Sequence, residues 1–120
     1  MPTEPEILTL AEAVRIATDA VDPNGGDDRI ADLRQRFEDR DEPISALTDS
    51  IESTMDEATR ALDVEGDDPA LTVAGAVVTY LAFRRDQAGD DPDRLIELAV
   101  DAEFDGNPPP AVAAYLAGEA

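Results

Sequence analysis

Apolar residues recur every three or four positions along most of this chain, the spacing that places side chains on one face of an α-helix. The expected helical segments cover residues 3–21, 27–40, 42–63, 69–87 and 91–104, with a short final helix from about residue 110. No segment alternates with the period of two that a half-buried strand requires. The pattern therefore predicts an all-α fold, a compact bundle of five to six helices.

The fourth segment differs from the others because it is apolar on nearly every face. Between residues 70 and 83, Thr72 and Thr79 are its polar interruptions. A helix that is apolar all round is a buried one. Asp68-Pro69, an N-cap aspartate followed by proline at the first helical position, marks its start. We therefore expect a helix over about 69–87 at the centre of the bundle.

Local signals predict where the other helices begin and which faces turn inward. Thr3 and Glu6 have the spacing of a capping box for the first helix, and residues 22–26 contain the Pro and Gly that stop it. The residues expected to face the core are Ile30, Leu33 and Phe37 of the second helix and Leu95, Leu98, Ala99 and Ala102 of the fifth. Their spacing follows the helical period.

The composition is strongly acidic: 29 Asp and Glu against nine arginines, no lysine, and a formal net charge of -20. Leu, Ile, Val and Phe number 27 of 120 residues, just above the roughly 20% below which a charged chain is expected to be disordered. The helical periodicity favours a folded chain, and the length fits one domain over residues 1–120.

Acidity without any lysine resembles the cytosolic proteins of salt-accumulating halophiles such as haloarchaea. Compact, hydrated carboxylates replace long apolar stems, and molar salt screens their repulsion. An acidic protein from an ordinary cell is the alternative.

The acidic N-terminus shows no signal peptide, and the longest uncharged run, residues 70–83, is too short to span a bilayer. We therefore expect a soluble, cytoplasmic protein with solvated cations at its surface.

The chain lacks several catalytic side chains. It has no His, Cys or Lys, so a serine-histidine triad, a cysteine-histidine dyad and a Cys/His zinc site are impossible within it. Any catalysis would have to use carboxylates, with Mg²⁺ or Ca²⁺. Residues 22–28 resemble the opening of a calcium loop but fail at its glycine, apolar and final glutamate positions. We expect no metal and no cofactor, and we favour a non-catalytic role.

Two groups of arginines are candidate sites. Arg29, Arg36 and Arg40 line the side of the second helix next to Phe37, where they either cover the core edge or form an interface.

Tyr80, Arg84 and Arg85 lie at the end of the central helix. They either cap its free carbonyls or form an anion-binding site, because Tyr80 and Arg84 share a face.

These observations favour a small protein-interaction or accessory module that self-associates as a homodimer. The apolar surface of the helices is more than 120 residues easily cover. We therefore expect some of Val73, Val77, Tyr80 and Phe83, which spread around the central helix, to stay exposed for a partner. The alternative is an enzyme or anion-binding domain using Tyr80, Arg84 and Arg85. A weaker alternative is a transcription accessory protein. Binding of nucleic acid is disfavoured by the net charge and by a last helix without basic or amide side chains.

Overall fold

Helices account for nearly all the regular structure in the computed structural model, which describes residues 8–63, 68–84 and 91–117. The elements are α1 (Leu10–Val21), α2 (Asp28–Arg36), the 3₁₀ helix η1 (Ile44–Leu47), α3 (Ile51–Leu62), α4 (Pro69–Phe83), α5 (Pro92–Phe104) and α6 (Pro110–Leu116). Within these ranges there is no strand, apart from one isolated bridge between Thr9 and Pro43. The prediction of an all-α bundle is confirmed.

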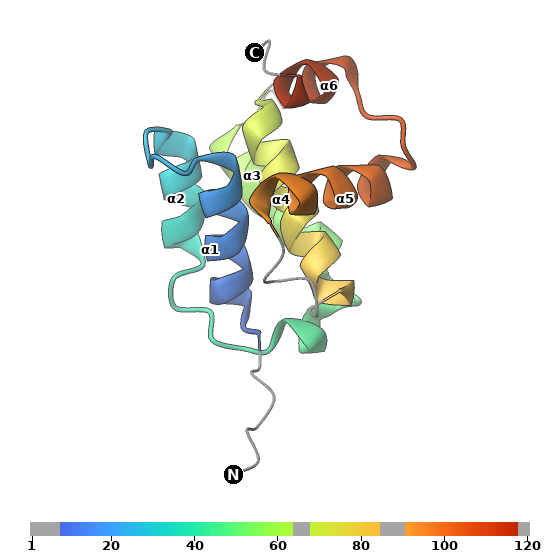
Figure 1. The fold of residues 1–120 in the computed structure, drawn as a ribbon. Coiled ribbons are helices and arrows are strands. Elements are labelled where there is room, and N and C mark those ends of the chain that lie inside the picture. The colour runs from blue at the N-terminus through green and yellow to red at the C-terminus, as the bar shows by residue number, and fades with distance from the viewer. Residues whose placement is uncertain (1–7, 64–67, 85–90, 118–120) are drawn as a thin grey trace.

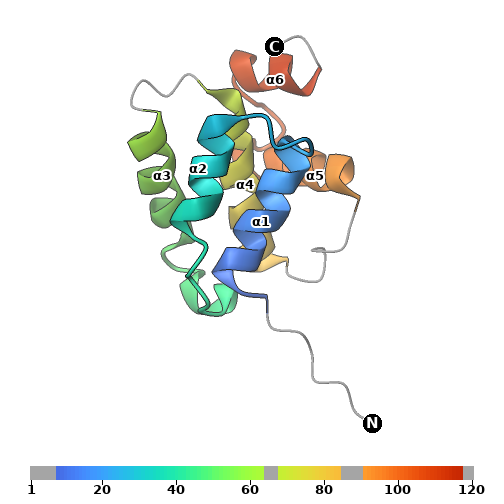
Figure 2. The same ribbon diagram turned by 90° about the vertical axis from the view of Figure 1, so that its left-hand side faces the viewer.

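Helices α1, α2, α3 and α4 run roughly along one direction, and α5 runs crosswise to them (Figures 1 and 2). Helix α6 lies across the end of the bundle where α1 finishes and α4 begins. The hydroxyl of Tyr115 on α6 donates a hydrogen bond of 3.0 Å to the carbonyl of Val21. This bond ties the last described helix to the first.

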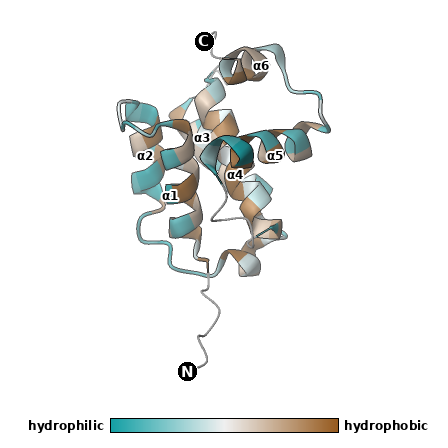
Figure 3. Ribbon diagram, in the orientation of Figure 1, coloured by the Kyte–Doolittle hydropathy of each residue, from teal (hydrophilic) through white to brown (hydrophobic). Residues whose placement is uncertain are grey.

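Helix α4 is the centre of the bundle, and the other helices and η1 all pack against it. Eleven of its fifteen residues are buried, and Leu71, Val73, Val77, Val78 and Leu81 are almost fully so. Its apolar colouring contrasts with the more hydrophilic α2 (Figure 3). The predicted central position is confirmed, but the helix ends at Phe83, because Arg84 has left the helical conformation. Residues 85–87 of the predicted helix lie outside the described ranges.

The first helix begins later than predicted. The predicted capping pair of Thr3 and Glu6 lies outside the described residues, and the N-cap is Thr9, whose hydroxyl accepts a hydrogen bond from the Glu12 amide. Leu10 donates its amide hydrogen to the Glu42 carbonyl at 3.0 Å. This extended pairing, together with the bridge at Thr9, holds Leu8 and Thr9 out of the helical conformation.

The predicted helix over 42–63 is instead two elements. Helix η1 covers 44–47, a turn follows, and α3 begins at Ile51. Thr48, Asp49 and Ser50 occupy the turn, and short polar side chains like these compete with helical hydrogen bonds. The apolar stripe does not reveal the break, because Ile44 before it and Ile51 after it are both buried. The second helix also ends early, since Phe37 is its C-cap.

The inward faces follow the predicted stripes in most places. Ile30, Leu33 and Phe37 are buried. On α5 the stripe is rotated: Leu95 and Ala99 are buried as expected, but so are Ile96 and Val100, whereas Ala102 is exposed and Leu98 only partly buried. Helices α4 and α1 pack against α5 and cover the face that carries the larger side chains.

Candidate functional site

The arginines of the α2 surface are largely paired within the chain. Arg29 lies 3.6 Å from Asp63 and 3.4 Å from Asp68, both in the connection between α3 and α4. Asp63 is buried, and one of its oxygens accepts the Asp68 amide hydrogen at 2.7 Å. Arg34 pairs with Asp19 of α1 at 3.2 Å. These pairs link α2 to its neighbours.

The other two predicted interface arginines differ from each other. Arg40 donates to both carboxylate oxygens of Glu42 at 3.0 Å, and this hydrogen bond lowers the pKa of Glu42. Its guanidinium also lies 5.8 Å from the centre of the Phe37 ring. Arg36 is exposed and forms no ion pair with a residue of the described ranges. Phe37 itself is 3% exposed, so its ring belongs to the core and is not available to a partner.

The loop that resembles a calcium-site opening uses its carboxylate on its own backbone. Asp22 accepts the amide hydrogens of Gly26 at 3.2 Å and Asp27 at 2.8 Å. Asp27 in turn caps α2. The loop is an acidic turn that starts a helix. Within the described residues, no group of three or more acidic side chains has the geometry of a metal site.

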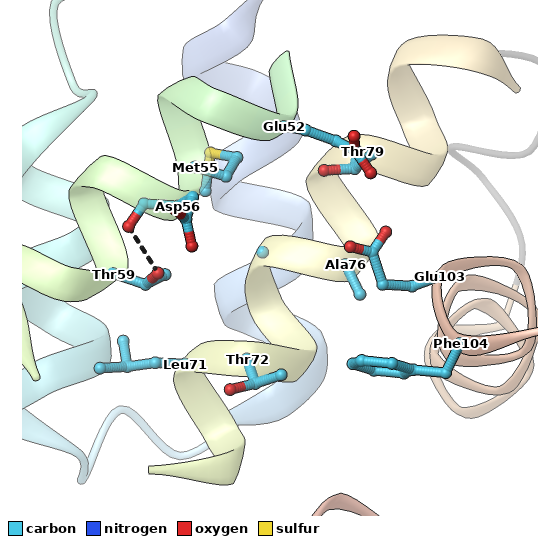
Figure 4. A pocket seen from close by; sticks show the side chains of 11 residues that line it. Glu52, Met55, Asp56, Thr59, Leu71, Thr72, Ala76, Thr79, Glu103 and Phe104 are labelled. Atoms are coloured by element: carbon cyan, nitrogen blue, oxygen red, sulfur yellow. Dashed lines mark hydrogen bonds between the residues drawn. The ribbon is translucent and has the colours of Figure 1, made fainter. Parts of the chain in front are cut away.

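Two hollows adjoin one another along α4, between α3 and α5. We call them together the α3/α5 groove, and they share the lining residues Glu52, Ala76, Thr79 and Glu103. The first, the Thr72 hollow, has a volume of about 130 Å³ and extends toward the start of α4 (Figure 4). The second, the Phe83 hollow, has a volume of about 340 Å³ and extends toward its end.

The Phe83 hollow brings together two of the predicted anion-site residues. Tyr80 and Arg84 both line it, one helical turn apart, as their spacing predicts. Arg85 lies outside the described residues. Phe83 also lines this hollow and is 60% exposed, the largest exposure of a large apolar side chain among the described residues. Ala99 and Ala102 of α5 complete an apolar wall.

The walls of the groove are acidic. Glu52 reaches in from α3 and Glu103 from α5, with their carboxyl groups on the same side of α4 (Figure 4). Partial burial raises the pKa of Glu103, and the negative charge of Glu52 raises it further. Both effects disfavour the charged carboxylate. A small anion in this hollow would meet two negative walls, whereas a cation would relieve their repulsion.

Sequence reasoning did not single out Glu52 or Glu103. They are separated by 51 positions, and each follows the ordinary pattern of an outward-facing acid on an amphipathic helix. One signal was present: Phe83 is the last apolar residue of the apolar segment 70–83 and is followed directly by two arginines. The crossing of α5 over α4, which no local pattern predicts, brings the two carboxylates to one groove.

Comparisons with known proteins do not extend this picture. No protein-family model matches the chain, and no curated protein or solved structure matches it. Among the helices of the described residues, none has the length and apolarity needed to cross a membrane. The function therefore has to be argued from the groove itself.

Proposed function

We propose that this protein is a non-catalytic protein-interaction module and that its contact surface is the α3/α5 groove. The observation that supports this is Phe83, 60% exposed beside a hollow with alanines on its wall. Exposed apolar surface bordered by charged groups is typical of protein contact sites, and an aromatic residue at its centre supplies much of the binding free energy.

The chemistry of the groove is consistent with binding and offers little for catalysis. Its titratable groups are Glu52, Asp56, Glu103, Tyr80 and Arg84. The chain has no imidazole or thiol to act as a base or nucleophile at neutral pH. Two carboxylates across an apolar floor instead suit a partner that brings an apolar side chain with a cationic group beside it.

We further propose that the protein works in a salt-rich cytoplasm, as the lysine-free acidic composition indicates. At a net charge of -20, self-repulsion opposes a core in which alanine is the most frequent apolar residue. Salt screens that repulsion. Circular dichroism should show progressive loss of helicity below about 0.5 M KCl. An unchanged spectrum down to low salt would contradict this habitat.

Site-specific photo-cross-linking in the native host tests the interaction proposal. With p-benzoylphenylalanine in place of Phe83, ultraviolet light should give one adduct of discrete mass with a protein. The matched control carries the same group in place of Leu116, the other exposed large apolar residue, which lies on α6 away from the groove. Ala102→Arg in the Phe83-labelled chain should abolish the adduct, because the new side chain fills the hollow. No adduct, or equal adducts at both positions, would reject the proposal.

A small-anion site is the second candidate, because Tyr80 and Arg84 line one hollow. Its weakness is the pair of glutamates on the same walls. Sulfate should raise the melting temperature of the wild-type protein and leave that of Arg84→Gln unchanged if the site exists. Equal shifts in both proteins, or no shift, would exclude it.

A further inference from the structure

The surface at the Phe83 hollow has both a protruding apolar side chain and a recess of a size to accept one. Phe83 projects at its edge with 60% of its surface exposed, and the hollow beside it has a volume of about 340 Å³, larger than a phenyl ring. Ala99 and Ala102 line the wall, so no large side chain from this wall fills the space. A protruding ring and a recess that accepts a ring thus lie on one surface.

The surface around the hollow also carries charges of both signs. Arg84 follows Phe83 directly in the sequence, and Glu52 and Glu103 line the opposite walls. A guanidinium forms two parallel hydrogen bonds with a carboxylate. The surface therefore presents a ring with a cation beside it and a recess with carboxylates beside it.

We propose that the occupant of the Phe83 hollow is a second copy of this chain, related by a two-fold axis that passes close to Phe83. Each Phe83 ring fills the hollow of the other copy, and each Arg84 lies against the other copy's Glu103. A two-fold interface uses the same patch on both copies, so each patch must complement itself. The Phe83 hollow meets that requirement. This inference rests on the proposed interaction function and names its partner.

A second copy also carries a net charge of -20, which opposes association in dilute buffer. Molar salt reduces the Debye length to about 3 Å and screens this long-range repulsion, while groups in direct contact are screened less. Placing Arg84 of one copy against Glu103 of the other brings opposite charges together at the interface. The dimer should therefore form in molar KCl and dissociate as salt is withdrawn.

Sedimentation equilibrium in about 1 M KCl tests the apolar part of the interface. The wild type should be dimeric, and Phe83→Ser should raise the dissociation constant at least about tenfold, as loss of a central aromatic side chain does. Leu116→Ser is the matched control and should leave the constant unchanged. Ala102→Arg, at an exposed position, is a second variant that blocks the hollow without removing Phe83. Circular dichroism verifies that each variant is folded.

Mixing two charge variants tests whether Arg84 and Glu103 meet across the interface. Arg84→Glu alone places two acids opposite each other at both contacts, and Glu103→Arg alone places two arginines opposite each other. Each variant should therefore be monomeric. A mixture should form a heterodimer, because both contacts then join an acid to an arginine. A contact within one chain predicts no such recovery, since each chain keeps its own like-charged pair.

The outcomes separate this inference from the proposed function. A monomeric wild type at every concentration rejects the second copy, yet an adduct with a different protein at position 83 would retain the interaction function. A dimer unaffected by Phe83→Ser, or weakened equally by Leu116→Ser, uses another surface and also overturns the inference. Failure of the mixture to recover association rejects the contact between Arg84 and Glu103.

Discussion

Phe37 and Phe83 occupy similar places in the sequence but opposite environments in the fold. Each lies at the end of a helix, as the C-cap of α2 or the last residue of α4, with arginines close by. Phe37 is 3% exposed and lies beneath the Arg40 guanidinium, whereas Phe83 is 60% exposed at the edge of a hollow. The difference shows that burial depends on which distant segments cover a residue.

The charged groups of the α2 surface and of the α3/α5 groove differ as well. Around α2, Arg29 and Arg34 reach carboxylates of other segments and hold the fold together. At the α3/α5 groove, Glu52 and Glu103 face one another, and the pKa of Glu103 is raised. Arg29 and Arg34 are therefore paired within their own chain, whereas the negative charges of Glu52 and Glu103 oppose each other.

Replacing the two phenylalanines gives the largest expected contrast. Phe37→Ala should reduce the free energy of unfolding by about 3 to 5 kcal/mol, because it removes a buried ring and leaves a cavity. Phe83→Ala should change it by less than about 0.5 kcal/mol, since the ring is mostly solvated. Urea unfolding at fixed molar KCl and low protein concentration measures both. Similar losses in the two variants would mean that Phe83 serves the monomer's core.

A smaller contrast is expected between Asp63, the C-cap of α3, and Asp56, which lies within that helix. Asp63→Ala should cost about 2 kcal/mol, because its buried carboxylate accepts the Asp68 amide hydrogen and lies near Arg29. Asp56→Ala, at an exposed position whose ion pair with Arg60 is on the surface, should cost less than about 0.5 kcal/mol. The same urea titrations compare them. Equal costs would show that the connection between α3 and α4 does not depend on Asp63.

The helices were predictable because their signals are local. Residues 70–83 are apolar on nearly every face, and Asp68-Pro69 supplies a cap, so the sequence alone indicated a central helix. The break at 48–50 was missed because the apolar stripe continues across it. Thr9 and Glu12 have the same capping-box spacing as Thr3 and Glu6, and choosing between these pairs required knowing that residues 8–10 pair with residues 42–44.

The groove could be predicted only in part. Tyr80 and Arg84 are four positions apart within the predicted helix 69–87, so their spacing predicted that they lie on one face. Glu52 and Glu103 belong to α3 and α5, and their approach depends on how those helices cross α4. Sequence periodicity gives the face of each helix but not the angle between helices, which depends on how side chains interlock. The acidic character of the groove therefore emerged from the fold.

Glycines provide the next test, with effects of opposite sign at two positions. A Cβ at Gly75, in the floor of the groove, would lie 3.7 Å from Thr59 and 3.8 Å from Met55, ordinary contact distances. Gly75→Ala should stabilise the protein by up to about 1 kcal/mol, because alanine is the better helix former. Gly106→Ala should destabilise it by about 1 kcal/mol, since Gly106 has a φ of +77° and a Cβ would lie 3.1 Å from Asp101.

Melting temperatures of the two glycine variants measure these effects. A Gly75→Ala protein less stable than the wild type would show that α3 and α4 pack too closely to admit a methyl group. The groove would then be narrower at Gly75 than the distances to Thr59 and Met55 indicate.

The smallest expected effect comes from Glu103, whose pKa is raised from an ordinary value of 4.5 by partial burial and by Glu52. Between the ordinary and the raised value, the folded state binds more protons than the unfolded state. The free energy of unfolding therefore falls as pH rises through that interval. At pH 7 the wild type bears the whole cost of the charged carboxylate, which Glu103→Gln removes. The variant should be more stable there by less than about 1 kcal/mol, because the side chain is largely solvated.

The stability difference between Glu103→Gln and the wild type should shrink as pH falls through that interval and be lost below about 4.5, where the carboxyl group is protonated in both states. Glu97→Gln, an exposed acid on the same helix, is the matched control for removing one charge from an acidic protein. Urea unfolding of dilute, monomeric protein across this pH range measures both variants. In a protein that already carries Glu52→Gln, the increase in the free energy of unfolding caused by Glu103→Gln should be smaller, because one cause of the raised Glu103 pKa is gone. A gain independent of Glu52, or no larger than that of Glu97→Gln, would show that the two walls of the groove do not repel one another.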